Sequence, residues 1–356
     1  MVTLFPMNQP YSTTKLSRLN AEQAELTRRV HHKRLHENAV SRSRWLPSIV
    51  AVLVLVCVPC PASSMELSGM LAIDAVSMTG KNTNRTTFEG GASTLQWPID
   101  VKTPSIRAGL AWRDFMEVHL GIIAEPWGSN NGRMEDMDYL DEARFPGRQP
   151  HPGVDIYSET ALDSKVLIVS VSTSVLPLRT RYLSAGLTAG YRYEEYDYRG
   201  YNTRQTGYGS WQDQSSWVTG PSAFYTVEYD ICSVGVALQG HVDDTIVLTF
   251  EASSLPLVHG SDEDEHLRRN RVTFTSTTGS GYQTSLRGLF RITQRWTIGS
   301  ECTYTRIAAD GDQDQFWYGD DPATPGFDDT GYSLSGIDAE QAQKNFRFTI
   351  GSSCSF

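Results

Sequence analysis

Residues 345–356, at the end of the chain, read NFRFTIGSSCSF. Two sets of side chains alternate in this stretch. One set is mainly apolar and comprises Phe346, Phe348, Ile350, Ser352, Cys354 and Phe356, while the residues between them are polar, charged or glycine. Because successive side chains of a β-strand point to opposite faces, this alternation predicts a strand with one apolar face. A closing strand that ends on a terminal phenylalanine is typical of an outer-membrane β-barrel.

The same two-residue period recurs upstream, for example in residues 183–191 and 296–304. The connections between such segments alternate in length. Short ones are expected near 112–115, 177–180, 242–244 and 293–295, and long, charged ones near 80–92, 128–153, 197–219, 260–271 and 309–336. Aromatic residues stand at the predicted strand ends: Trp112, Phe115, Tyr182, Phe290 and Trp296. This pattern predicts an all-β fold, a ten-stranded antiparallel transmembrane β-barrel with long extracellular loops and short periplasmic turns.

The first 64 residues differ in composition from the rest. An apolar run at 46–58 follows Arg42, Arg44 and Trp45 and precedes the small residues of 61–64. This order predicts an export signal at 1–64 with an extended basic n-region, cleaved after Ser64, so that the barrel occupies 65–356. A translation start further downstream is the alternative. A lipoprotein anchor at Cys57 or Cys60 is a weak alternative, because no small residue precedes either cysteine.

Charge and cysteine content exclude several classes of protein. The chain has a formal net charge of -10. The first 64 residues are basic, so the remainder is strongly acidic and is expected to repel nucleic acid and to attract cationic peptides. No apolar run approaches the roughly 20 residues that a spanning helix needs. Beyond the signal, Cys232, Cys302 and Cys354 are odd in number and widely spaced, which predicts neither a disulfide framework nor a metal site.

Two short acidic clusters carry the chemistry. Asp136 and Asp138 lie in NGRMEDMDYLD, and Asp264 and His266 lie in GSDEDEHLRRN. In each cluster the two residues are two positions apart, so on extended backbone their side chains point to the same side. A histidine beside one aspartate and facing two more carboxylates can activate a water molecule. The alternative is a solvated acidic loop or a loose cation site, although calcium prefers oxygen ligands to a histidine.

From Gly69 to Phe356 the chain resembles the omptins, outer-membrane proteases of Gram-negative bacteria. The match is carried by MEDMDYLD at 134–141 and SDEDEH at 261–266. Smaller agreements lie in register around these motifs: Gly80-Lys81, Arg85, Glu89-Gly90-Gly91, Leu95-x-Trp97, Ala111-Trp112, Trp127-Gly128-Ser129 and Gly190-Tyr191. The resemblance implies a ten-stranded barrel that extends well above the membrane, with an active site in a groove at its top that faces the cell exterior.

The resemblance also implies a role for each acidic residue. Asp264 would orient His266, which would take a proton from water, while Asp136 and Asp138 would hold the same water and support charge on the scissile carbonyl. The resemblance therefore implies a water-attack endopeptidase of aspartic type, without a covalent acyl-enzyme. The expected substrates are cationic peptides and proteins, host proteins among them, and no cofactor or metal is expected.

The substrate pocket departs from the omptin pattern. Omptins cleave between two basic residues and hold the substrate cation with two carboxylates. One of them matches Asp262, but the other aligns with Asn84 in GKNTNR. We therefore expect a preference for basic residues that is weaker or broader than is usual in the family. Met134, beside the first aspartate pair, is expected either to line the substrate groove or simply to pack.

Lipid binding is the second departure. Omptins depend on lipopolysaccharide, whose phosphates they bind through basic residues on the outer wall. Here Tyr191 matches, but Glu195 stands where an arginine would be expected, and 275–281 contains no basic residue. We expect contact with outer-membrane lipid without the usual phosphate site.

The alternative function is that of a non-enzymatic barrel, an adhesin or structural protein that keeps the omptin shell. That class predicts loss of the four catalytic residues, and all four are present. A pore is disfavoured, because inward charged residues such as Glu301 and Arg347 are expected to pair and to fill a narrow barrel.

Overall fold

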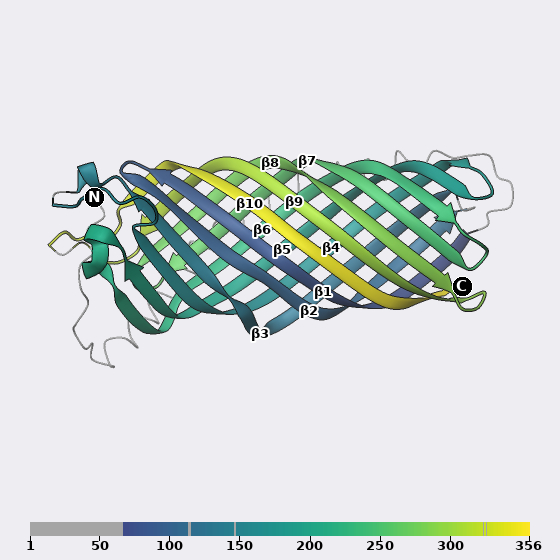
Figure 1. The fold of residues 1–356 in the computed structure, drawn as a ribbon, viewed down its shortest axis with the longest axis horizontal. Coiled ribbons are helices and arrows are strands. Elements are labelled where there is room, and N and C mark those ends of the chain that lie inside the picture. Colours follow the sequence, from purple (N-terminus) through teal and green to yellow (C-terminus); the bar gives the residue numbers. More distant parts are fainter. Residues whose placement is uncertain (1–66, 113–114, 146, 323, 325) are drawn as a thin grey trace. The chain divides into compact units, whose positions relative to one another are not determined.

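The structure is a computed structural model that describes residues 67–112, 115–145, 147–322, 324 and 326–356. The described residues form ten antiparallel strands that close into one barrel, with neighbours in the order β1-β10-β9-β8-β7-β6-β5-β4-β3-β2 (Figure 1). The strands are β1 (Leu67–Phe88), β2 (Gly91–Trp112), β3 (Met116–Leu140), β4 (Ile156–Arg179), β5 (Leu183–Gly207), β6 (Ser216–His241), β7 (Ile246–His266), β8 (Arg271–Arg291), β9 (Trp296–Trp317) and β10 (Ser333–Ser355). The predicted fold class is therefore confirmed. The predicted export signal lies outside the described residues and stays a prediction.

The barrel closes where its first and last strands meet. β1 pairs with β10 from Met70 opposite Ser355 to Thr87 opposite Asp338. Beyond this ladder, Gly69 N donates to Phe356 O at 2.9 Å, and Phe356 N donates back to Gly69 O at 3.0 Å. The terminal phenylalanine thus completes the ladder and leaves neither strand with an open edge.

One end of the barrel carries the four short turns that join β2 to β3, β4 to β5, β6 to β7 and β8 to β9. The other end carries the two short 3₁₀ helices that the described residues contain, η1 (Glu142–Arg144) and η2 (Gly209–Gln214) (Figure 1). No helix within the described residues is long and apolar enough to span a membrane.

The strands are longer than the sequence predicts. Only Glu89 and Gly90 separate β1 from β2, and only residues 267–270 separate β7 from β8. Most of three stretches expected to be long loops, 80–92, 197–219 and 260–271, is strand, and the strands also extend into the other two, 128–153 and 309–336. These stretches carry charged side chains, which we interpreted as loop composition. A strand that rises into water can be polar on its outward face, so polarity alone does not end it.

Outward-facing apolar side chains gather near the end with the short turns. They include Leu71, Ile73, Ile106, Leu110, Leu120, Ile122, Leu187, Val236, Leu248, Phe250, Leu286, Ile298, Phe348 and Ile350, all more than one third exposed. Such a belt suits the hydrocarbon of a bilayer and is costly in water. It defines the membrane-spanning part of the barrel, and the acidic clusters lie on the other side of it.

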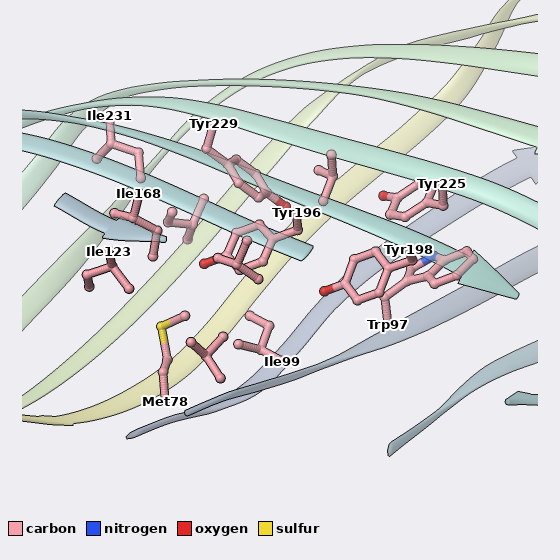
Figure 2. Close-up of a cluster of buried hydrophobic side chains, with 14 of the residues drawn as sticks. Met78, Trp97, Ile99, Ile123, Ile168, Tyr196, Tyr198, Tyr225, Tyr229 and Ile231 are labelled. Carbon is pink, nitrogen blue, oxygen red and sulfur yellow. The ribbon is translucent and has the colours of Figure 1, made fainter. Parts of the chain in front are cut away.

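Side chains fill the interior of the barrel. At the level of the belt, Glu301 forms ion pairs with Arg107, Arg287 and Arg347 at 3.8, 2.8 and 3.5 Å. The expected pairing of Glu301 with Arg347 is therefore confirmed. Further from the short turns, a hydrophobic cluster of buried side chains includes the rings of Trp97, Tyr196, Tyr198, Tyr225 and Tyr229 (Figure 2). Through Tyr225, which donates to Asp262, this aromatic cluster contacts one of the acidic segments.

Candidate active site

The two acidic clusters lie on strands that face each other across the barrel. Asp136 and Asp138 belong to β3, and Asp264 and His266 belong to β7. Three strands separate β3 from β7 on one side of the ring and five on the other. We expected the clusters at the start of loops, whereas all four residues lie within strands. The two residues of each pair share one face of their strand because they are two positions apart on extended backbone, as the sequence predicts.

Asp264 and His266 form a pair on β7. The Nε2 atom of His266 lies 3.0 Å from Oδ2 of Asp264. Asp264 is buried at 2% exposure, and its Oδ1 has no hydrogen-bond partner among the described residues. A carboxylate at Nε2 fixes the ring and leaves Nδ1 as the nitrogen that can accept a proton. This arrangement is that of a histidine base held by a buried aspartate.

Asp136 and Asp138 hold two carboxyl groups on the same face of β3. Their side chains keep partial access to solvent, and Ser93 Oγ donates to Oδ1 of Asp136 at 3.0 Å. Burial raises the pKa of both groups, and the charge of Asp136 raises that of Asp138 further. The pair therefore retains a proton at neutral pH, mainly on Asp138, while Ser93 favours the charged form of Asp136.

The two pairs stand on strands that face each other across the barrel, and the region inside the barrel between these pairs is called the recess here. The negative charge of Asp264, on the opposite strand, contributes to the raised pKa of Asp136. Such an effect requires that little solvent screens the two carboxylates from each other. His266 can act as a base, Asp136 is the ionised aspartate and Asp138 the protonated one. General acid–base chemistry needs this set of groups.

Asp262 lies on the same face of β7, two residues from Asp264, and is 6% exposed. Its Oδ2 accepts hydrogen bonds from Asn84 Nδ2 at 2.6 Å, from Tyr225 OH at 3.2 Å and from Gln341 Nε2. The structure therefore brings Asn84 and Asp262 together, although they are far apart in the sequence. Both lie within strands, whereas we expected Asn84 in the first loop.

Two acceptor atoms remain unpaired beside this contact. Oδ1 of Asp262 and Oδ1 of Asn84 are both buried and have no hydrogen-bond donor among the described residues. A buried acceptor without a donor costs about 1–3 kcal/mol, so such a pair is suited to a ligand that brings N–H groups. The ring of Tyr225 stacks on that of Trp97 with centroids 4.3 Å apart (Figure 2), which gives the pocket an aromatic base.

Met134 has a different place from the aspartates that follow it. It is 7% exposed and belongs to the aromatic cluster around Trp97. Of the two roles expected for Met134, packing is the one for which the structure gives contacts.

The loops around the recess are fastened to one another. Arg148 binds Asp213 through two nitrogen atoms, at 2.7 and 3.0 Å, and stacks on the ring of Trp211 at 4.1 Å. On the opposite side, Arg269 binds Asp321 at 2.9 Å, and Trp317 Nε1 donates to the same carboxylate. These contacts join Arg148 to η2, and Arg269 to Asp321 after β9.

Sequence reasoning missed several neighbours of the site. Ser93, Tyr225 and Gln341 bind its carboxylates, and the charge of Arg271 lowers the pKa of Asp136 and Asp138. Arg271 is the first residue of β8, and its register opposite His266 could not be read from the sequence. Among the described residues, no group of three or more histidine, cysteine, aspartate or glutamate side chains is placed to hold a metal ion.

Comparison with known proteins identifies a family, and solved structures of outer-membrane proteins are similar to the chain. The model of the family described as the Omptin family matches residues 81–341, more than two thirds of the chain. The crystal structure of the outer membrane protease OmpT from Escherichia coli is similar, with a TM-score of 0.65 and 15% identity over 83% of this chain and 99% of that one. The outer membrane protein OprG from Pseudomonas aeruginosa aligns with a TM-score of 0.33 and 8% identity, over 81% and 95% of the two chains. No curated protein matches the chain significantly.

The buried Asp262 predicts a pH-dependent effect on stability. Burial raises the pKa of this carboxyl group to about 6 from its ordinary value of 3.8, although hydrogen bonds from Thr275, Gln341 and Asn84 favour the charged form. A carboxyl group whose pKa is raised on folding stabilises the fold below its unfolded pKa, and this stability is lost as pH rises through the folded pKa. Asp262→Asn cannot ionise. It should therefore stabilise the barrel at about pH 8 by on the order of 1–3 kcal/mol relative to its effect at about pH 4.

Equilibrium unfolding in denaturant, at both pH values, measures this difference. Glu135→Gln, which removes a carboxylate from the outward face of β3, is the control for the loss of a carboxylate outside the recess. Equal effects of Asp262→Asn at the two pH values would mean that Asp262 is not held in a buried, charge-poor pocket.

Proposed function

Because the chain belongs to the omptin family, we propose that it is an outer-membrane endopeptidase that hydrolyses peptides and proteins by attack of water. The observation that supports this most strongly is the convergence of the Asp264–His266 pair with the facing Asp136–Asp138 pair in one recess. The recess lies on the far side of the apolar belt from the short turns. In an outer membrane this end faces the cell exterior.

We propose that a water molecule is held between His266 and the aspartate pair of β3. The Nδ1 atom of His266 takes a proton from this water as its oxygen attacks the scissile carbonyl carbon. Asp264, hydrogen-bonded at Nε2, stabilises the imidazolium that forms. The proton retained by the Asp136–Asp138 pair is donated as a hydrogen bond to the carbonyl oxygen. Collapse of the tetrahedral intermediate breaks the C–N bond, and the imidazolium protonates the leaving amine.

The substrate pocket is proposed at Asp262 and Asn84. The two unpaired acceptor oxygens there suit a guanidinium or ammonium group, which brings N–H donors and positive charge. Asp262 supplies the negative charge above about pH 6, where its carboxyl group is ionised. Asn84 adds an acceptor without a charge, so we propose a preference for arginine or lysine that is broader than a pocket of two carboxylates would give.

His266→Ala and Asp138→Ala should each lower the rate of peptide cleavage by at least roughly 10²–10⁴-fold, because each removes a group that holds or moves a proton. Refolded protein and a fluorogenic peptide with two adjacent basic residues provide the measurement. Glu135→Gln is the matched control, since its carboxylate lies on the outward face of β3 and binds Tyr157 at 3.0 Å. Near-normal cleavage by either alanine variant, with the barrel assembled, would contradict the mechanism. Absence of cleavage by the unmodified protein would favour the non-enzymatic barrel.

The pocket predicts which bonds are cut. Profiling with a peptide library should show enrichment of arginine and lysine next to the cleavage site. Asn84→Glu should raise kcat/KM for such peptides by about five- to tenfold, because it adds a charge-assisted hydrogen bond of roughly 1 kcal/mol or more. The same substitution should not improve cleavage at neutral residues. A library profile without basic enrichment would show that Asp262 does not bind the substrate.

The outer wall provides the basis for a proposal on lipid. Above the apolar belt, Glu195 accepts from Tyr193 OH at 2.8 Å, Glu228 accepts from the same hydroxyl at 2.9 Å, and Lys165 lies 2.8 Å from Asp197. The three carboxylates Glu195, Glu228 and Asp197 thus outnumber Lys165 and the exposed Arg199 at this part of the wall, and phosphate groups would be repelled. We propose contact with outer-membrane lipid without a phosphate site here.

Refolded protein should therefore cleave its peptide at the same rate with and without added lipopolysaccharide. The comparison is made in detergent micelles, with assembly of the barrel checked under both conditions. Strict dependence of cleavage on lipopolysaccharide would show that another, basic patch binds its phosphates.

A further inference from the structure

One charged side chain in the recess has no place in the mechanism so far. Arg271 begins β8, where it lies in register opposite His266 on β7 and opposite Trp317 on β9. Its side chain shares the inward face of β8 with the buried Thr273 and Thr275. The register thus places the guanidinium of Arg271 beside His266.

Arg271 is held in place without being neutralised. Its NH1 donates to Gln315 Oε1 at 3.4 Å, and its guanidinium lies 5.7 Å from the centre of the Trp317 ring. Neither partner is charged. The Nε atom is buried and has no hydrogen-bond acceptor among the described residues. A buried guanidinium donor without an acceptor is costly, so this N–H is suited to an acceptor that arrives with the substrate.

The neighbouring Arg269, unlike Arg271, has a charged partner. Its Nε and NH2 both lie 2.9 Å from Oδ2 of the buried Asp321, so its charge is already compensated. Burial lowers the pKa of Arg271 to about 10, and the charges of Asp264, Asp321 and Asp136 act against this lowering. Arg271 is thus fully cationic at neutral pH and interacts electrostatically with both sides of the recess.

The proposed reaction creates a negative charge where such a cation is needed. As the water oxygen bonds to the carbonyl carbon, the electron pair of the C=O π bond moves to the carbonyl oxygen. This oxyanion would develop close to Asp136 and Asp264, which repel it. One hydrogen bond from a shared carboxyl proton does not offset two carboxylates.

We propose that Arg271 is a further catalytic residue, which binds the carbonyl oxygen of the scissile bond through its free guanidinium N–H and stabilises the oxyanion of the tetrahedral intermediate. This inference rests on the proposed hydrolysis of peptides. When the intermediate collapses, the electron pair returns to re-form the carbonyl, the C–N bond breaks and the amine leaves with the proton carried by His266. Arg271 neither gains nor loses a proton in the cycle.

Steady-state kinetics of Arg271→Ala tests the proposal. Removal of one oxyanion donor costs about 10²–10³-fold in kcat, and KM should change little because the contact strengthens only in the transition state. Added guanidinium ion should restore part of kcat in this variant, and Arg271→Lys should retain more activity than Arg271→Ala. Arg268→Ala is the matched control, because Arg268 is exposed and donates to the carbonyl oxygen of Thr219.

The pH profile separates catalysis from electrostatic tuning. The facing groups are Asp136, Asp138, Asp264, His266, Arg269 and Asp321, and the charge of Arg271 lowers the pKa of Asp136 and Asp138. If Arg271 only kept Asp136 ionised, Arg271→Ala would regain full kcat at higher pH. Our proposal predicts that the loss persists across the profile.

Four outcomes would overturn the proposal: unchanged kcat in Arg271→Ala, a loss confined to KM, recovery at higher pH, or a loss that guanidinium ion does not reverse although the barrel is assembled. Each requires that the unmodified protein and Arg268→Ala cleave the peptide. If neither of these cleaves it, the proposed peptidase function fails, and the Arg271 proposal fails with it.

Discussion

The hydrogen-bonded ladder between β1 and β10 closes the sheet, and the rest of the structure depends on that closure. A closed ring fixes β3 opposite β7, although their functional residues are far apart in the sequence. It also removes the open edges that a sheet of this length would otherwise expose. The proposed catalytic groups thus stand on strands rather than on loops, so their separation is set by the ring.

Closure also explains the electrostatics of the recess. Inward side chains of ten strands have little room, so carboxyl groups placed there lose much of their hydration. Burial raises the pKa of Asp136, Asp138 and Asp262, and the same low polarity strengthens the effect of Asp264 on Asp136. Proton retention by one aspartate, which the proposed mechanism requires, is therefore a consequence of the architecture. The burial that causes this proton retention also lowers the stability of the barrel, because charged groups are held in a site that disfavours charge.

Much of the fold follows from the sequence, because one face of each strand in the apolar belt must be apolar. The period of two in 183–191 and 345–356 therefore marks strands reliably. Above the belt both faces can be polar, so 80–88 and 260–266 resembled loops although they continue β1 and β7. The spacing Asp-x-Asp and Asp-x-His placed each pair on one face correctly. The family resemblance led us to expect Asn84 and Asp262 in one substrate pocket, but the direct contact between them, which spans 178 residues, was not predicted. Arg271 was missed because its place opposite His266 depends on strand register.

The central claim is that the recess activates water to cut a peptide bond directly. Cleavage of a peptide with two adjacent basic residues in heavy-oxygen water, with a competing amine nucleophile present, tests it most directly. The account predicts one heavy oxygen in each new carboxylate, no transfer of the peptide to the amine and no burst of the first product. Peptide–amine adducts or a burst would reveal a covalent acyl-enzyme, and no cleavage at all would exclude peptidase activity; either result would contradict the account.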